Sequence, residues 1–399
     1  MIFSRAKISD AFRKYGLPVV VGSWLILVVC AFYSFMAGHQ VVGLSDGHGH
    51  PFGQCFINFW SAAKLAATGH IGDIYNWDVF HAFEQNTAGA TLIDYHYSYP
   101  PLTPLLTLPL AWFPYASAFI VWMFATWAAF YAVLRAARPP VNAFLLSWAT
   151  PAFLINAAAG QNGMLTAALL GGGLVLLPKR PLIAGILFGL LCFKPQLGFL
   201  IPVALIAGKE WRTAIAAALT VVLLVAASLV VYGPEPWIGY MKMSQFLRHY
   251  VLEDNTAQSW QQFESIFVAA RQVGAGITAA YAIQGLFALA SVACIVKLWH
   301  GKASPDIRNA ALVLGTFMAT PYAMDYDLVI MVLVAVWLSH AYPHYKFAAA
   351  SLLVMPFISS YVGISYGIGV GPLMLLPACL LVLSSCKTPR AVIAPTSSP

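Results

Sequence analysis

The stretch TAIAAALTVVLLVAASLVV, residues 213–231, carries no charged side chain and decides the class of fold. An α-helix needs roughly 20 apolar residues to cross about 30 Å of hydrocarbon, so this run can span a membrane. Similar runs recur along the 399-residue chain and alternate with short polar segments. Because helices and closed barrels satisfy every backbone hydrogen bond within lipid, this alternation predicts an all-α polytopic membrane protein.

The overall composition agrees with that class. The chain is 60% hydrophobic and 9% charged, whereas soluble domains carry about 25% charged residues. The net charge of +7 does not indicate a nucleic-acid partner, because lysines and arginines stand in short clusters between the apolar runs. That distribution is typical of the positive-inside rule, so we expect membrane lipids and no nucleic acid as partners.

The apolar runs organise residues 1–399 into one membrane domain, with no separate soluble domain. We expect about 10–12 spans from the length that a helix needs to cross the bilayer. Basic clusters before the first run and after the last one predict that both termini lie in the cytoplasm. Besides residues 213–231, the predicted spans and hairpins are residues 17–37, 115–134, 141–156, 164–177, 181–207, 277–297, 310–337 and 347–383.

One segment leaves the span count open. Either the proline-rich residues 101–114 or the piece around Lys194 supplies an extra turn through the membrane, but not both. The positive charges favour two half-helices that meet at Lys194, because this choice keeps the neighbouring basic residues on the inner side. Length favours the other choice, since residues 181–207 are long enough to cross once.

Two polar loops, residues 38–100 and residues 232–275, are predicted on the outer side. The first loop holds five of the 14 carboxylates and six of the ten histidines of the chain. Within it, residues 56–67 predict a helix whose apolar stripe lies flat on the bilayer surface. A largely apolar chain that concentrates its acids and imidazoles in one loop is expected to do its chemistry there.

Polar side chains also interrupt the apolar runs at three places, and each has a simple interpretation as a loop turn or an inter-helix hydrogen bond. That interpretation is weakest for Lys194, because a lysine in mid-span costs on the order of 2.5–3.5 kcal/mol on insertion scales. A cation at that depth requires an anion, and a lipid phosphate is the natural candidate. The three insertions are Gln161 with Asn162, Lys194 with Gln196, and Asp325 with Asp327.

The sequence lacks the usual cofactor and metal motifs: no Walker A pattern, dinucleotide fingerprint, HExxH or CxxC is present. His48 and His50 fit a flexible polar loop better than a metal site, so we expect no metal and no cofactor. Tryptophans and tyrosines of the first loop offer flat faces for stacking sugars, and its carboxylates offer acceptors for sugar hydroxyls. An interfacial aromatic belt explains the same aromatic residues, so both interpretations stay open.

Five phrases recur in order over about residues 53–340: CFINFWSAAKLAATGHIGDIYN, YSYPPLTPLLTLPLAWFPY, GQNGMLTAALLGG, ILFGLLCFKPQLGFLIPVALIAGKEWR and TPYAMDYDLVIMVLVAVWL. Together they resemble glycosyltransferase family 87. The resemblance implies a GT-C-like fold with a large first extracytoplasmic loop and a catalytic pocket on the outer face. It also implies a polyprenyl-phosphate-linked sugar donor, typically of mannose, and a bacterial inner membrane as the location.

The resemblance implies a catalytic aspartate at the start of the flat helix, where this chain has Cys55. A thiol with a pKa near 8.5 is mostly neutral at pH 7, so the catalytic role does not carry over to Cys55. Either another acid acts as the base, with Asp46 and Asp94 the nearest acids in sequence, or the activity is altered or lost. The residues assigned to substrate binding are Asn58, Trp60, His96, Tyr99, Gln161, Asn162, Lys194, Gln196, Asp325 and Asp327.

These observations lead to two hypotheses. The first is a membrane-embedded hexosyltransferase, with mannose as the expected sugar. It uses a polyprenyl-phosphate-linked donor to extend a glycolipid or glycan acceptor of the cell envelope. The second is a non-catalytic homologue, or a transporter or flippase of lipid-linked sugars. A transporter is expected to have polar residues in several spans and a repeat between its halves. The sequence shows no repeat, which favours the transferase.

Overall fold

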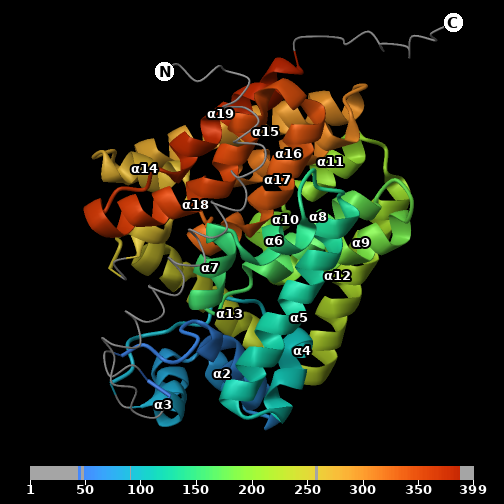
Figure 1. Ribbon diagram of the computed structural model, residues 1–399. Coiled ribbons are helices and arrows are strands. Elements are labelled where there is room, and N and C mark those ends of the chain that lie inside the picture. The colour runs from blue at the N-terminus through green and yellow to red at the C-terminus, as the bar shows by residue number, and fades with distance from the viewer. Residues whose placement is uncertain (1–43, 46–48, 90, 257–258, 387–399) are drawn as a thin grey trace, which may run out of the picture.

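The computed structural model describes residues 44–45, 49–89, 91–256 and 259–386 (Figure 1). The predicted first span, residues 17–37, and the acid Asp46 lie outside the described residues. In the part of the chain that is described, the structure is 76% helical and contains no strand. The prediction of an all-α polytopic membrane protein is therefore confirmed.

Within the described ranges, four helices are long and apolar enough to cross a membrane. They are α5 (Tyr115–Ala136), α12 (Trp211–Tyr232), α15 (Ile277–His300) and a segment, Pro343–Tyr366, that contains α18 (Lys346–Tyr366). Protein covers little of α12, since Leu219, Leu223 and Val230 are 57%, 68% and 86% exposed. An apolar helix with so little protein contact requires lipid around it.

The remaining helices are shorter, and several fill the interior between the long ones. They are α2 (Phe56–Ala67), η1 (Ile71–Tyr75), α3 (Trp77–Ala88), α4 (Thr103–Thr107), η2 (Leu108–Trp112), α6 (Ala143–Trp148), α7 (Pro151–Ala158), α8 (Gly163–Leu176), α9 (Pro181–Leu190), η3 (Leu191–Phe193), α10 (Pro195–Gly198), α11 (Ile201–Ala207), α13 (Glu235–Leu247), η4 (Arg248–Glu253), η5 (Trp260–Gln262), α14 (Ile266–Gln272), α16 (Pro305–Ala319), η6 (Asp325–Ile330), α17 (Met331–Ala341), η7 (Pro343–Tyr345) and α19 (Gly371–Ser384).

Two groups of helices form the body of the molecule. In the first group α5 contacts α8, α8 contacts α9, and α9 contacts α12, while in the second group α15 to α19 pack in chain order. The short helix η6 contacts α8 of the first group and α17 and α18 of the second group, and it also contacts α7. Figure 1 shows α2 and α3 together at one end of the molecule, away from α16 and α17. The residues of η6 therefore lie at the junction of the two groups.

The helix predicted over residues 56–67 is present as α2, and protein covers its aromatic face. Its aromatic stripe packs against α5: Phe59 stacks on Trp122 with ring centroids 5.2 Å apart, and Trp60 meets Tyr115 edge-on at 5.5 Å. Phe56 is fully buried as well. Sequence periodicity identified this apolar face without identifying the protein that covers it, and the location of α2 at the bilayer surface stays a prediction.

The segment around Lys194 forms two half-helices. Gly185 of α9 lies against Thr213 and Ala216 of α12, and Gly189 lies against Thr220, so the two helices run in the same direction. The chain returns through α10 and α11 to the start of α12, which means that it reverses direction at Lys194. Of the two alternatives left open above, this arrangement supports the half-helices that meet at Lys194.

A tight turn between α7 and α8, residues 159–163, joins distant parts of the chain. Gly160 has φ +61°, and a Cβ at this position would overlap the carbonyl oxygen of Gly53. On the other side of the turn, a Cβ on Gly163 would overlap the carbonyl oxygen of Tyr326. The turn is thus in main-chain contact with the start of α2 on one side and with η6 on the other, and side chains larger than hydrogen do not fit.

We predict that Gly160→Ala destabilises the protein, because it combines a left-handed backbone conformation with a steric overlap. The free energy of unfolding should fall by roughly 1–3 kcal/mol, measured by thermal unfolding in one detergent. Gly285→Ala is the matched control, since Gly285 lies within α15 and a Cβ there meets nothing within 4 Å. Equal melting temperatures for the two variants would contradict a closely packed turn.

Candidate active site

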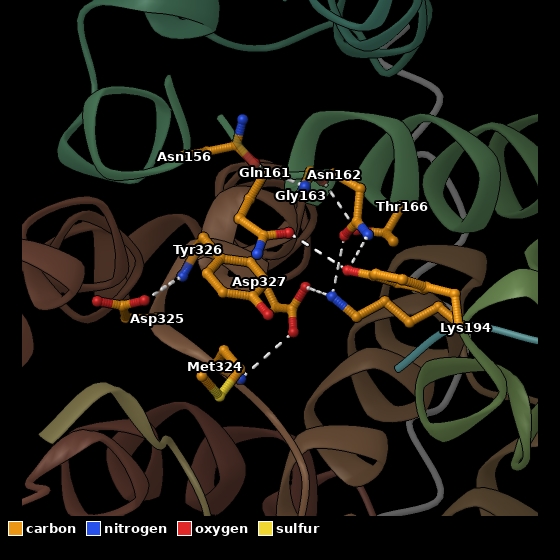
Figure 2. Close-up of polar contacts among 11 residues, drawn as sticks. Asn156, Gln161, Asn162, Gly163, Thr166, Lys194, Met324, Asp325, Tyr326 and Asp327 are labelled. Carbon is orange, nitrogen blue, oxygen red and sulfur yellow. Dashed lines mark hydrogen bonds and ion pairs between the residues drawn. The ribbon is translucent and has the colours of Figure 1, made fainter. Parts of the chain in front are cut away.

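Lys194 lies at the centre of a buried polar cluster. Its side chain is 2% exposed, and its ammonium group donates to Asp327 Oδ1 at 2.5 Å and to Asn162 Oδ1 at 3.0 Å. The ammonium also lies 4.7 Å from the ring centroid of Tyr326. Figure 2 shows that these groups converge on Lys194 from different segments of the chain. The cation predicted to require an anion has one in Asp327.

Proline 195 explains why Lys194 can leave the helical path. The residue before a proline is pushed out of the α region, and Lys194 has φ −132° and ψ 71° between η3 and α10. A break in the helix at this point directs the side chain away from the helix surface and into the cluster. Gln196, two residues later, is half-buried and makes no side-chain hydrogen bond within the described part of the chain. A role of Gln196 in substrate binding remains a prediction.

The turn between α7 and α8 supplies the amides of the cluster. Asn162 Nδ2 donates to the hydroxyl of Tyr99 at 2.8 Å, and that hydroxyl in turn donates to Gln161 Oε1 at 3.3 Å. The turn itself is held by Asn156, whose Oδ1 accepts from the Gly163 backbone N–H at 2.6 Å. Tyr99 is buried, so its ring comes from the first polar loop into the helical body. The chain therefore connects that loop to Lys194 through one side-chain network.

The short helix η6 carries two carboxylates, Asp325 and Asp327, which have different partners. Asp327 is fully buried, pairs with Lys194 and also accepts from the Met324 backbone N–H at 3.3 Å. Asp325 is 8% exposed and accepts from the Tyr326 backbone N–H at 2.7 Å and from Ser360 Oγ at 3.2 Å. Figure 2 shows the two carboxylates on opposite sides of Tyr326. Asp325 forms no ion pair within the described residues.

Cys55 begins α2 beside this cluster. Its backbone N–H donates to the Ala159 carbonyl at 3.1 Å, and its side chain hydrogen-bonds with Gln161. Removal from water raises the pKa of the Cys55 thiol to about 11, and the charges of Asp325 and Glu84 act in the same direction. The thiol is therefore protonated at neutral pH, which fits the expectation that Cys55 cannot act as a base.

The other residues assigned to the first loop have hydrogen-bond and ring partners outside the Lys194 cluster within the described residues. Asn58 donates to the His96 carbonyl at 3.1 Å, and the His96 ring stacks on Trp77. Burial lowers the pKa of His96 to about 4, so the imidazole is neutral at physiological pH. Trp60 donates its indole N–H to the Phe113 carbonyl at 3.1 Å. These side chains hold the loop together, and their role in substrate binding remains a prediction.

Two further acids of the loop differ in their surroundings. Asp94 is about half exposed and lies 3.4 Å from His81, and no hydrogen bond joins it to the Lys194 cluster within the described residues. Glu84 of α3 is fully buried, and both of its carboxylate oxygens lack a hydrogen-bond partner in the described structure. Burial raises the pKa of Glu84 well above its usual value, which favours the neutral acid.

Reasoning from the sequence missed two contributors to the cluster. Tyr326 covers the ammonium of Lys194, and Ser360 of α18 orients Asp325. The position of Tyr326 between two selected aspartates was a signal that could have identified it. Ser360 lies in an ordinary apolar helix and carries no such signal. Among the described residues, no group of three or more histidine, cysteine or acidic side chains could hold a metal ion.

The fold and the cluster define a polytopic membrane protein with a preformed, buried ion pair at the junction of two helix groups. Residues 97–321, more than half of the chain, match the family model for Glycosyltransferase family 87. The chain belongs to this family and is a membrane glycosyltransferase by that membership. Comparisons with curated proteins and with solved structures gave no match.

We predict that breaking the buried pair costs far more stability than removing it whole. Lys194→Met leaves Asp327 buried without its cation and should lower the free energy of unfolding by about 3–5 kcal/mol. The double variant Lys194→Met/Asp327→Leu should recover most of that loss, because neither charge then remains. Thermal unfolding in one detergent measures both.

The matched control is Lys297→Met, since Lys297 is exposed on α15 and its replacement should change stability by no more than about 0.5 kcal/mol. If the double variant unfolds at the same temperature as Lys194→Met, the unpaired charge of Asp327 does not account for the loss of stability in Lys194→Met.

Proposed function

We propose that this glycosyltransferase moves a hexose, mannose in the first instance, from a polyprenyl phosphate to an envelope glycolipid or glycan. Both termini would lie in the cytoplasm, and transfer would occur on the outer face of a bacterial inner membrane. Membrane lipids, the donor and the acceptor are then its partners. The observation that carries this proposal is the Lys194 cluster. In it a buried ammonium group, surrounded by apolar helices, is bound by Asn162 and Asp327.

The cluster suits a phosphate leaving group. An ammonium group has three N–H donors, and in Lys194 two of them serve Asp327 and Asn162. The remaining side of the ammonium faces the Tyr326 ring. A donor phosphate that displaces this ring would accept the third N–H, and the negative charge that grows on the phosphate during transfer would be stabilised there. Amides at the same turn, from Gln161 and Asn162, add further donors.

The connection between the cluster and the first polar loop supports the same reaction. Tyr99 comes from that loop and bonds to both Gln161 and Asn162. A sugar held among the loop's aromatic and polar side chains would thus lie next to the phosphate-binding residues. Donor and acceptor would then lie within one site, as transfer between two bound substrates requires.

A non-catalytic homologue is the second candidate, because the protonated thiol of Cys55 stands where the family resemblance expects a carboxylate. Such a protein would bind lipid-linked sugars or move them across the membrane without transferring the sugar. The two candidates differ in whether a new glycosidic bond forms, and this difference is directly measurable.

We predict that the purified protein transfers labelled mannose from polyprenyl-phosphate mannose to a component of a membrane lipid extract. The variant Lys194→Met/Asp327→Leu is the control, because it removes the phosphate-binding cation while keeping the buried volume apolar. It should transfer at least about 10²-fold more slowly. Thin-layer chromatography of the labelled lipids measures the product.

The opposite result is equally clear. If no sugar moves from polyprenyl-phosphate mannose, glucose or galactose, the transferase proposal fails. Movement of the labelled lipid between the leaflets of a vesicle, without a new product, would instead support the transport role.

A further inference from the structure

Transfer of a sugar to a hydroxyl group requires a base that takes the hydroxyl proton. Of the acids near the Lys194 cluster, Asp327 is already committed, since it pairs with Lys194 and accepts from the Met324 N–H. Glu84 is fully buried without a hydrogen bond, and its raised pKa favours the protonated acid, which cannot accept a proton. Asp94 is about half exposed beside His81.

Asp325 combines the features that these acids lack. It lies two residues from Asp327 on the same short helix, and it forms no ion pair within the described residues. Hydrogen bonds from the Tyr326 backbone and from Ser360 Oγ fix its orientation. Its side chain is 8% exposed, whereas Asp327 and Glu84 are fully buried.

Asp325 also lies close to Cys55, across the turn between α7 and α8. The turn touches Gly53 on one side and Tyr326 on the other through main-chain contacts at Gly160 and Gly163. The carboxylate of Asp325 is near enough for its charge to act on the Cys55 thiol. The first loop and η6 therefore contact the same turn from opposite sides, and the loop contributes a neutral thiol where η6 contributes a carboxylate.

We propose that Asp325 is the catalytic base of the transfer reaction, an inference that rests on the proposed function. The Asp325 carboxylate takes the proton of the acceptor hydroxyl while the hydroxyl oxygen forms a bond to the anomeric carbon of the donor sugar. The bond between that carbon and the phosphate oxygen breaks, and its electron pair stays on the phosphate. Asp325 ends as the neutral acid, and the polyprenyl phosphate leaves with one more negative charge beside Lys194.

The charged surroundings of Asp325 suit a base that works near neutral pH. Burial raises the pKa of Asp325 to about 6, opposed by the hydrogen bonds from Tyr326 and Ser360 and reinforced by the charge of Asp327. The other titratable groups that interact with it are Cys55 at the start of α2 and Glu264 before α14. Above about pH 6 the carboxylate is ionised and can accept a proton, and below that pH its activity as a base is lost.

The test compares four purified proteins in the mannose-transfer assay: wild type, Asp325→Asn, Asp325→Asn/Cys55→Asp and Asp306→Asn. Asp325→Asn keeps the size of the side chain and should lower kcat by at least about 10²-fold with little change in KM. In the double variant, Cys55→Asp supplies a carboxylate on the other side of Gln161. Its kcat should be at least about tenfold higher than that of Asp325→Asn. Asp306 pairs with His340 at the other end of α16, so Asp306→Asn should retain wild-type kcat.

The pH profile separates a catalytic role from a structural one. Wild-type kcat should fall below about pH 6, and this acid limb should be absent from the residual activity of Asp325→Asn. If Asp325→Asn keeps wild-type kcat within twofold, or keeps the same acid limb, Asp325 is not the base. A large loss in Asp94→Asn together with an active Asp325→Asn would place the base in the loop. A wild-type protein that transfers no sugar would instead overturn the proposed function itself.

Discussion

The buried ammonium of Lys194 is the constraint on which the rest of the site depends. A charge removed from water costs several kcal/mol after relaxation, and good geometry with additional hydrogen bonds is needed to offset it. Here Asp327 and Asn162 provide the counter-charge and the acceptor. These partners lie 133 and 32 residues away along the chain. The hydrogen bonds of this one ammonium group therefore connect three segments: the helix break at Pro195, the turn before α8 and the short helix η6.

The same segments are also closely packed through their main chains. Such an approach requires residues without side chains at the points of contact. Gly160 and Gly163 occupy those points, against Gly53 and Tyr326. The phrase GQNG thus has two functions in the structure. Its glycines permit the approach of neighbouring main chains, and the amides between them supply the polar atoms.

The sequence predicted the parts of this site better than their arrangement. Asn162, Lys194 and Asp327 were identifiable one by one, because a polar residue inside an apolar run is costly and therefore needs a partner. Their meeting was not predictable, since pairing across 133 residues depends on the packing of whole helices. The same limit explains α2, whose bounds matched the prediction although its aromatic face packs on α5. Proximity in sequence to Cys55 selected Asp46 and Asp94, whereas proximity in space selects Asp325.

The location of Asp325 on η6 has a consequence for how the site could work. Asp325 and Asp327 lie on one element of six residues, and Asp327 is tied to Lys194. A base on η6 would keep a fixed separation from the phosphate-binding cation, because any movement of η6 shifts both. A base in the first loop would lie on a different segment from Asp327, the partner of the cation. An acid on η6 therefore joins the base and the partner of the phosphate-binding cation in one short element. A cysteine at position 55 is then compatible with the reaction, because the base lies on η6 and not at the start of α2.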